Sequence, residues 1–151
     1  MAIVAWREQM SLNYLPLDQE HQAFLKVVNY SITAAHAGDF DGMERVFEAC
    51  YDYVRNHFSH EEDIMERISF PDMKAHMQAH RTFIKNISEF RQKYEKAPTP
   101  AQKKEAAVKT ADFLSLWLIG HILSRDKLLK PYLVRLRNLP PRMNYDSPLG
   151  V

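Results

Sequence analysis

His57 and Glu61 are two metal-ligating side chains separated by four residues. They lie in a run from Met43 to Phe70 without glycine or proline, which is typical of one long helix. On an α-helix this spacing places an imidazole and a carboxylate on one face, about one turn apart, where both can reach the same buried metal ion. That face is otherwise apolar, and a lone buried carboxylate is costly, so the pair predicts further ligands from other elements.

Five more ligand-type residues recur on apolar helical faces, which gives the set His21, His57, Glu61, His76, His80, His121 and Asp126. His76 and His80 share one face. His121 and Asp126 are five residues apart, about 140° around a straight helix, so the helix must end or loosen between them. Seven ligands exceed the four of a structural zinc and suit two octahedral metals that share carboxylates. Imidazole with carboxylate fits iron, zinc or manganese.

Four long amphipathic segments with short links position these residues. The predicted helices are Asp18–Ala37, Asp41–Arg67, Pro71–Lys96 and Pro100 through His121, followed by a short segment Asp126–Arg137. Asp18 is the expected N-cap of the first helix, and Thr99 with Gln102 forms an expected capping box for the fourth. No segment shows sustained alternation with period two, which argues against a sheet. The expected fold is all-α: an antiparallel up-down four-helix bundle with an N-terminal arm, a short C-terminal helix and a tail. The expected domain covers residues 1–137, with the tail at 138–151.

Composition excludes several function classes. The formal net charge is +1 with interspersed signs, which is unlike a nucleic-acid binder. A single cysteine provides no internal disulfide framework. The start lacks the pattern of a signal peptide, and no apolar stretch approaches the roughly 20 residues of a membrane span. We therefore expect a cytoplasmic protein.

The sequence resembles the hemerythrins, and within them the single-domain bacterial hemerythrins, from about Trp6 to Leu133. The motifs that carry the resemblance are Leu17–Gln22, His57–Met65, His76 with His80, and Trp117–Ile122 with Asp126. One histidine–carboxylate pair alone would be a weak match, whereas seven ligands in order on four helices are specific.

The resemblance implies a non-haem di-iron centre. One iron would be held by His76, His80 and His121. The other would be held by His21 and His57. Glu61 and Asp126 would bridge the two irons, together with an oxo or hydroxo group. The second iron would keep one coordination position for dioxygen, and the apolar pocket around it would contain Trp117, Leu118 and Ile122.

The expected function is therefore reversible, non-enzymatic dioxygen binding for storage, delivery or sensing. The expected partners are dioxygen and an oxidase or sensor protein, with no nucleic acid and no membrane span, for a monomer or weak oligomer. The alternatives are a di-iron redox enzyme and a scavenger of nitric oxide, peroxide or iron. Ferritin-like enzymes use a Glu-x-x-His motif, and no glutamate here is followed three residues later by histidine. The scavenger alternative stays open at this point.

Other residues near the motifs are given no role in the metal site. His60 lies about 100° from Glu61 around a helix and is expected to point away from the site. Glu62 is expected to be solvated. Cys50 is expected to be a small buried apolar side chain. Tyr53 is assigned no role.

Overall fold

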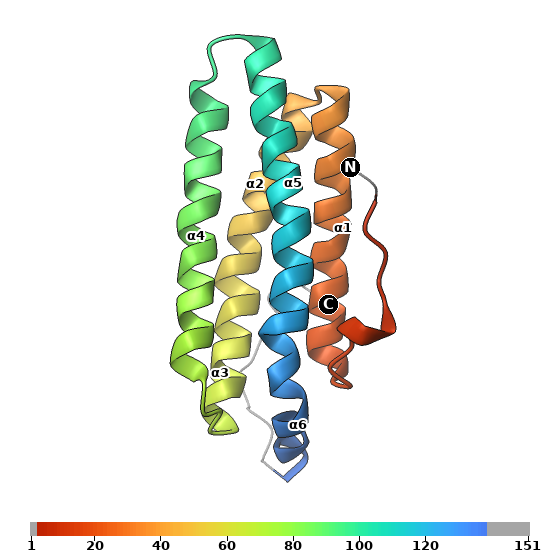
Figure 1. The fold of residues 1–151 in the computed structure, drawn as a ribbon, viewed down its shortest axis with the longest axis vertical. Coiled ribbons are helices and arrows are strands. Elements are labelled where there is room, and N and C mark those ends of the chain that lie inside the picture. Colours follow the sequence, from red (N-terminus) through yellow and green to blue (C-terminus); the bar gives the residue numbers. More distant parts are fainter. Residues whose placement is uncertain (1–2, 139–151) are drawn as a thin grey trace.

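The computed structural model describes residues 3–138, which form helices and turns with no strand among them. Four long helical segments stand side by side as an antiparallel bundle (Figure 1). They are α1 Leu15–Ala37, α2 Phe40–Tyr53 continued by η2 Val54–Phe58 and α3 Ser59–Arg67, α4 Met73–Lys96, and α5 Pro100–Ser124. Neighbouring pairs are α1 with α2, α3 with α4, α4 with α5, and α5 with α1. The predicted all-α bundle is confirmed. Apart from Asn138, the predicted tail at 138–151 lies outside the described residues.

An N-terminal arm runs along α1 and contains one short turn, η1 Glu8–Met10 (Figure 1). Asn29 on α1 ties the arm down, because its side-chain amide bonds both the N–H and the C=O of Val4 at 2.8 Å. Met10 and Leu12 of the arm are buried. The arm therefore belongs to the packed structure.

The prediction that Asp18 caps the first helix is wrong. The helix α1 begins at Leu15, because a proline at position 16 is tolerated in a first turn, where its missing N–H has no helical partner anyway. Asp18 instead accepts hydrogen bonds from the Leu12 N–H at 2.9 Å and from Ser11 Oγ at 2.7 Å. Its carboxylate holds the arm against the turn that precedes His21.

The second predicted helix is one continuous rod with a wider turn inside it. Asp39 caps α2 by accepting the Gly42 N–H at 2.9 Å, and α3 ends at Arg67, close to the predicted bounds. Between them, η2 is a π-helical stretch that includes His57. The expectation of plain α-helix here is therefore wrong. Such π-turns are rare and occur often at functional sites, because they re-aim the side chains that they carry.

The last predicted helices hold, with small shifts. Pro71 precedes α4, which begins two residues later at Met73. The Thr99 side chain accepts the Gln102 N–H, as expected for the cap of α5. After Ser124 the chain changes to η3 Asp126–Leu129, α6 Lys130–Leu133 and η4 Val134–Asn138. The break that His121 and Asp126 require therefore falls between them.

Two apolar clusters fill the bundle, and His21, Glu61, His76, His80 and Asp126 lie between their residues in sequence, whereas His57 and His121 lie at the edge of the larger cluster. The larger cluster includes Phe24, Phe58, Phe83 and Ile122. The smaller one includes Leu12, Leu17, Ile64, Met65, Ile68, Phe70, Leu129 and Leu133. A layer of buried polar side chains thus lies between two apolar regions.

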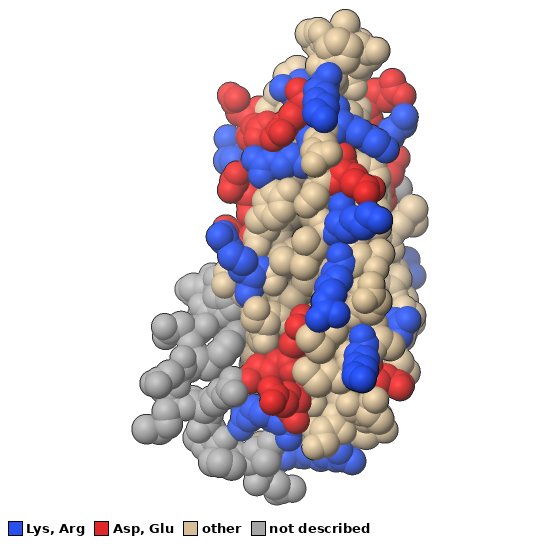
Figure 2. Space-filling model, turned by 90° about the vertical axis from the view of Figure 1, so that its left-hand side faces the viewer, with Lys and Arg blue, Asp and Glu red and all other residues tan. Residues whose placement is uncertain are grey.

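The outer surface carries mixed charge, and on the face in Figure 2 the Lys and Arg side chains are interspersed with Asp and Glu. The run Pro100–Leu136 is long and apolar enough to cross a membrane by length and composition alone, so the expectation that no stretch approaches that length is wrong. In the bundle, α5 packs against α1 and α4. A core helix of this kind is weak evidence for a membrane span.

Candidate metal centre

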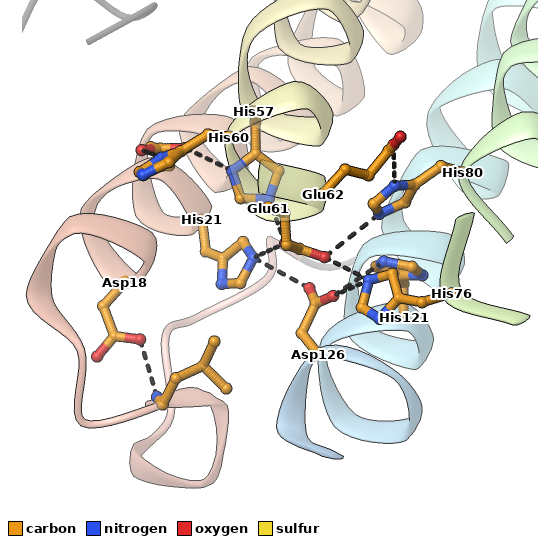
Figure 3. A network of polar contacts seen from close by, with 12 residues as sticks. Asp18, His21, His57, His60, Glu61, Glu62, His76, His80, His121 and Asp126 are labelled. Atoms are coloured by element: carbon orange, nitrogen blue, oxygen red, sulfur yellow. Dashed lines mark hydrogen bonds and ion pairs between the residues drawn. The ribbon is translucent and has the colours of Figure 1, made fainter. Parts of the chain in front are cut away.

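The seven predicted ligands meet in the polar layer of the bundle. Glu61 and Asp126 lie in the middle, with His21 and His57 on one side and the other three histidines on the opposite side (Figure 3). Two overlapping groups have ligand atoms within 4.8 Å of one another: Glu61, His76, His80, His121 and Asp126, and His21, His57, Glu61 and Asp126. All seven side chains are buried. The four helical segments of the bundle, and the turn η3 after α5, thus contribute to one centre.

Each carboxylate divides its two oxygens between the two histidine groups. Glu61 Oε2 lies 2.9 Å from His57 Nε2 and 3.7 Å from His21 Nε2. Glu61 Oε1 lies 3.3 Å from His80 Nε2 and also contacts His76 Nε2.

Asp126 repeats this division. Its Oδ2 lies 3.0 Å from His21 Nε2, and its Oδ1 lies 3.0 Å from the Nε2 atoms of both His76 and His121. Every histidine therefore presents Nε2 inward, and each carboxylate has one oxygen facing each group. This is the arrangement of two carboxylates that bridge a pair of metal ions.

The inward-facing nitrogen and oxygen atoms also lack the partners that buried polar atoms normally have. The five Nε2 atoms and the four oxygens of Glu61 and Asp126 face only one another, and no hydrogen bond from any other group in the described residues satisfies them. Buried polar atoms without partners are rare because each costs free energy. Nine such atoms around one point are explained by metal ions, since imidazole nitrogen and carboxylate oxygen are the ligands that iron, zinc and manganese accept. The residues fit a two-metal centre.

Without metal, the charges of the centre bind protons instead. Burial lowers the pKa of His21, but Asp126 and Glu61 outweigh it and raise that pKa to about 10. Burial likewise lowers the pKa of His76, and the same two carboxylates raise it to about 10. Burial raises the pKa of Glu61, but the histidines around it hold that pKa well below its ordinary value. Metal uptake must therefore displace protons from these histidines.

Glu20 is a functional residue that the sequence interpretation missed. It is buried, and its two oxygens lie 2.7 Å from His57 Nδ1 and 2.6 Å from His60 Nδ1. Burial raises the pKa of Glu20, but the hydrogen bonds from the two histidines bring that pKa below its ordinary value, so the carboxylate is ionised. The bond to Nδ1 fixes the tautomer of His57 that presents Nε2 to a metal. His60 belongs to neither group of ligand atoms, in line with the expectation that it points away from the site, but it is buried and bonds this outer carboxylate.

Glu62 has the equivalent place on the other side of the centre. Its Oε2 lies 2.9 Å from His80 Nδ1, and its side chain is 28 % exposed (Figure 3). Glu62 is therefore partly solvated, as expected, but it also bonds a ligand histidine, which the sequence interpretation missed. Sequence spacing does not single out Glu20 or Glu62. A general chemical rule could have suggested that nearby carboxylates bind the ligand histidines, because a metal-bound histidine commonly donates its other N–H to a carboxylate.

The three predicted pocket residues lie in and against the larger apolar cluster beside the centre. Leu118 and Ile122 are each 1 % exposed. Trp117 is half-buried and stacks on His121, with 4.6 Å between ring centroids and 14° between ring planes. Trp117 thus covers the three-histidine side, whereas the resemblance implied a pocket on the other side. Cys50 is fully buried, as expected, and burial raises the pKa of its thiol.

Comparisons with known proteins agree with this geometry. The family described as "Hemerythrin HHE cation binding domain" matches residues 15–133. The chain is 26% identical to a bacteriohemerythrin of Stenotrophomonas maltophilia, with 84% of this chain and 79% of that protein covered. It is 28% identical to a bacteriohemerythrin of Methylococcus capsulatus, with 88% and 98% covered. A solved structure of a leucine-to-phenylalanine mutant superposes with a TM-score of 0.75 at 27% identity, with 88% of this chain and 98% of that one covered.

Proposed function

The chain belongs to the hemerythrin family, whose match spans residues 15–133, and on that premise we propose that it binds dioxygen reversibly at a non-haem di-iron centre. The observation that carries the proposal is the division of the Glu61 and Asp126 oxygens between two groups of histidines. One iron would be held by His76, His80 and His121, and the other by His21 and His57. An oxo or hydroxo group would complete the bridge.

The two sides of the centre offer unequal numbers of protein donors. Three imidazoles and two carboxylate oxygens make five donors on one side, and two imidazoles and two oxygens make four on the other. A bridging oxygen between the irons would add one donor to each. An octahedral ion takes six ligands, so the side of His21 and His57 keeps one position for an exogenous ligand. The donor count therefore favours a binding site for one small molecule.

Buried apolar side chains around the centre favour reversible dioxygen binding. Leu118, Ile122 and Phe58 are buried next to the histidines and keep bulk water away. When bound, the two irons supply the electrons that dioxygen takes up on binding and returns on release. The protein holds the imidazole rings in place through Glu20 and Glu62, and this limits rearrangement of the centre as charge shifts.

A direct experiment tests this function. The protein is loaded with ferrous iron under anaerobic conditions, exposed to dioxygen, and followed by visible absorption and metal analysis. We expect two irons per chain and a new visible band that vanishes under vacuum and returns with fresh dioxygen. A band that decays only as nitric oxide, peroxide or another substrate is consumed would contradict a carrier and support the enzyme or scavenger alternative. Tight binding of a single zinc would contradict the carrier function and also the enzyme and scavenger alternatives.

We place this function in the cytoplasm, in a monomer or weak oligomer that stores, delivers or senses dioxygen, with an oxidase or a sensor protein as partner. The single buried Cys50 suits a reducing compartment, because it forms no disulfide within the chain. The mixed surface charge of the face in Figure 2 gives no support to nucleic-acid binding. We further propose that the bundle in residues 1–137 is the dioxygen-binding unit and that the tail at 138–151 is an appendage to it.

A further inference from the structure

Tyr53 lies directly against the two-histidine side of the centre. It is the last residue of α2, one turn before His57. Its ring stacks on the His57 ring, with 4.5 Å between centroids and 12° between planes. It also stacks on Phe24, at 3.9 Å and 8°. Two parallel neighbours fix the orientation of the ring, and one of them is a histidine of the two-histidine side.

That hydroxyl has no hydrogen-bond partner among the described residues, and the side chain is 1 % exposed. A buried hydroxyl without a partner destabilises a protein. The other fully buried tyrosine, Tyr94, behaves in the ordinary way and donates to the Phe40 carbonyl at 3.1 Å. A phenylalanine would fill the same space as Tyr53 without the cost. A bound ligand that is not part of residues 3–138 would therefore account for the hydroxyl of Tyr53.

The surroundings indicate where this partner sits. The ring of Tyr53 stacks on His57, whose Nε2 lies 2.9 Å from Glu61 Oε2 and whose Nδ1 lies 2.7 Å from Glu20 Oε1. The phenol therefore lies against a ligand of the two-histidine side. The acids of the centre direct their oxygens to histidines, which leaves the phenol as a free donor.

We propose that the Tyr53 hydroxyl donates a hydrogen bond to the small polar or anionic ligand bound on the His21–His57 side, and thereby sets how tightly that position retains it. This inference rests on the proposed function, because it needs a metal held by those two histidines. Its chemistry selects ligands with an acceptor atom beside the phenol. A ligand without such an acceptor gains nothing from Tyr53.

The test uses the iron-loaded protein in its oxidised state with azide as the probe, because azide is a small anion with terminal acceptor nitrogens. The variants are Tyr53→Phe and the matched control Tyr51→Phe. Tyr51 is on the same helix as Tyr53, is half-buried and packs against Arg91 of α4, so the control removes the same oxygen away from the centre. We expect the azide dissociation constant to rise about tenfold in Tyr53→Phe, as for one lost charge-assisted hydrogen bond, and to stay unchanged in Tyr51→Phe. The stretching band of bound azide should shift in D₂O in the wild type and not in Tyr53→Phe.

The metal-free protein gives an independent measurement. Tyr53→Phe should unfold at the same or a higher denaturant concentration than the wild type, because the hydroxyl has no partner to lose. Lower stability of this variant would show that the hydroxyl is bonded within the protein, and would overturn the inference. Equal azide affinity in Tyr53→Phe and the wild type would overturn it too, while leaving the proposed function intact. A wild-type protein that takes up iron but does not bind azide would overturn the proposed function together with this inference.

Discussion

Replacing Glu20 with glutamine should weaken one metal position and spare the other. Glu20 accepts hydrogen bonds from His57 and His60 at 2.7 and 2.6 Å, and its side chain is 5 % exposed. Glutamine has nearly the same shape but no charge. The bond to His57 then becomes a neutral one, and the amide NH₂ faces His60, which must change its tautomer to accept it.

The size of the effect follows from the type of bond that is lost. A hydrogen bond to a charged group contributes about 1.5–3 kcal/mol and a neutral one about 0.5–1.5 kcal/mol. The difference is on the order of 1.4 kcal/mol, or about tenfold in affinity, at the low end of the 10–100-fold that outer carboxylates commonly contribute to metal sites. We expect this loss only at the position of His21 and His57.

Competition with a chelator, followed by metal analysis, measures the two positions as two steps of release. In Glu20→Gln, one metal equivalent should leave about tenfold more readily. Glu62→Gln is the matched variant for the three-histidine side. Its effect should be smaller, because Glu62 bonds one ligand histidine and is 28 % exposed, so water can replace it. Glu66→Gln removes an exposed charge from the same helix and should change neither step. Equal loss of both metals in Glu20→Gln, or no loss, would refute the reasoning.

Four further perturbations have defined outcomes. His21→Ala should lose one metal equivalent and keep the other, and His80→Ala should weaken the opposite position; metal analysis that finds both equivalents in either variant would contradict the assignment. In the metal-free protein, burial lowers the pKa of His21 and His76 but Asp126 and Glu61 raise both to about 10, above the ordinary 6.5. Their stabilisation is complete below about pH 6.5 and is lost as pH rises through about 10, so denaturant midpoints should fall over this window in the metal-free form. Leu118→Ala should reduce stability by about 2–5 kcal/mol and shorten the life of the dioxygen adduct, seen as faster decay of its visible band, because it leaves a cavity through which water reaches the centre.

Local chemistry made much of the bundle predictable from the sequence. The predicted end of the first helix at Ala37 holds because Gly38 takes a left-handed conformation there, and the predicted cap at Thr99 holds because its side chain accepts a first-turn N–H. The separation of His121 from Asp126 required a break that the structure places after Ser124. Such signals act within a few residues and need no knowledge of the partners.

Features that depend on distant contacts could not be predicted in this way. Asp18 looks like a cap locally, but the folded arm offers it the Leu12 N–H instead. The residue types of Val54–Phe58 give no signal of the π-helical winding that the structure shows there. Glu20 and His60 are 40 positions apart, and their contact exists only once α1 and α3 lie side by side.

The polar layer has a consequence for how the bundle holds together. Apolar packing is interrupted where the ligand residues lie, so the small cluster around Leu17, Ile64 and Leu129 shares little apolar contact with the larger one. Metal ions held by ligands from all four helical segments would join the two regions across this gap. Without the ions, the end of the bundle with the smaller cluster should open as a foldon of its own, with amide hydrogen exchange faster there than around Phe83. Under the function that we propose, the metal pair would therefore also make the bundle a single cooperative unit.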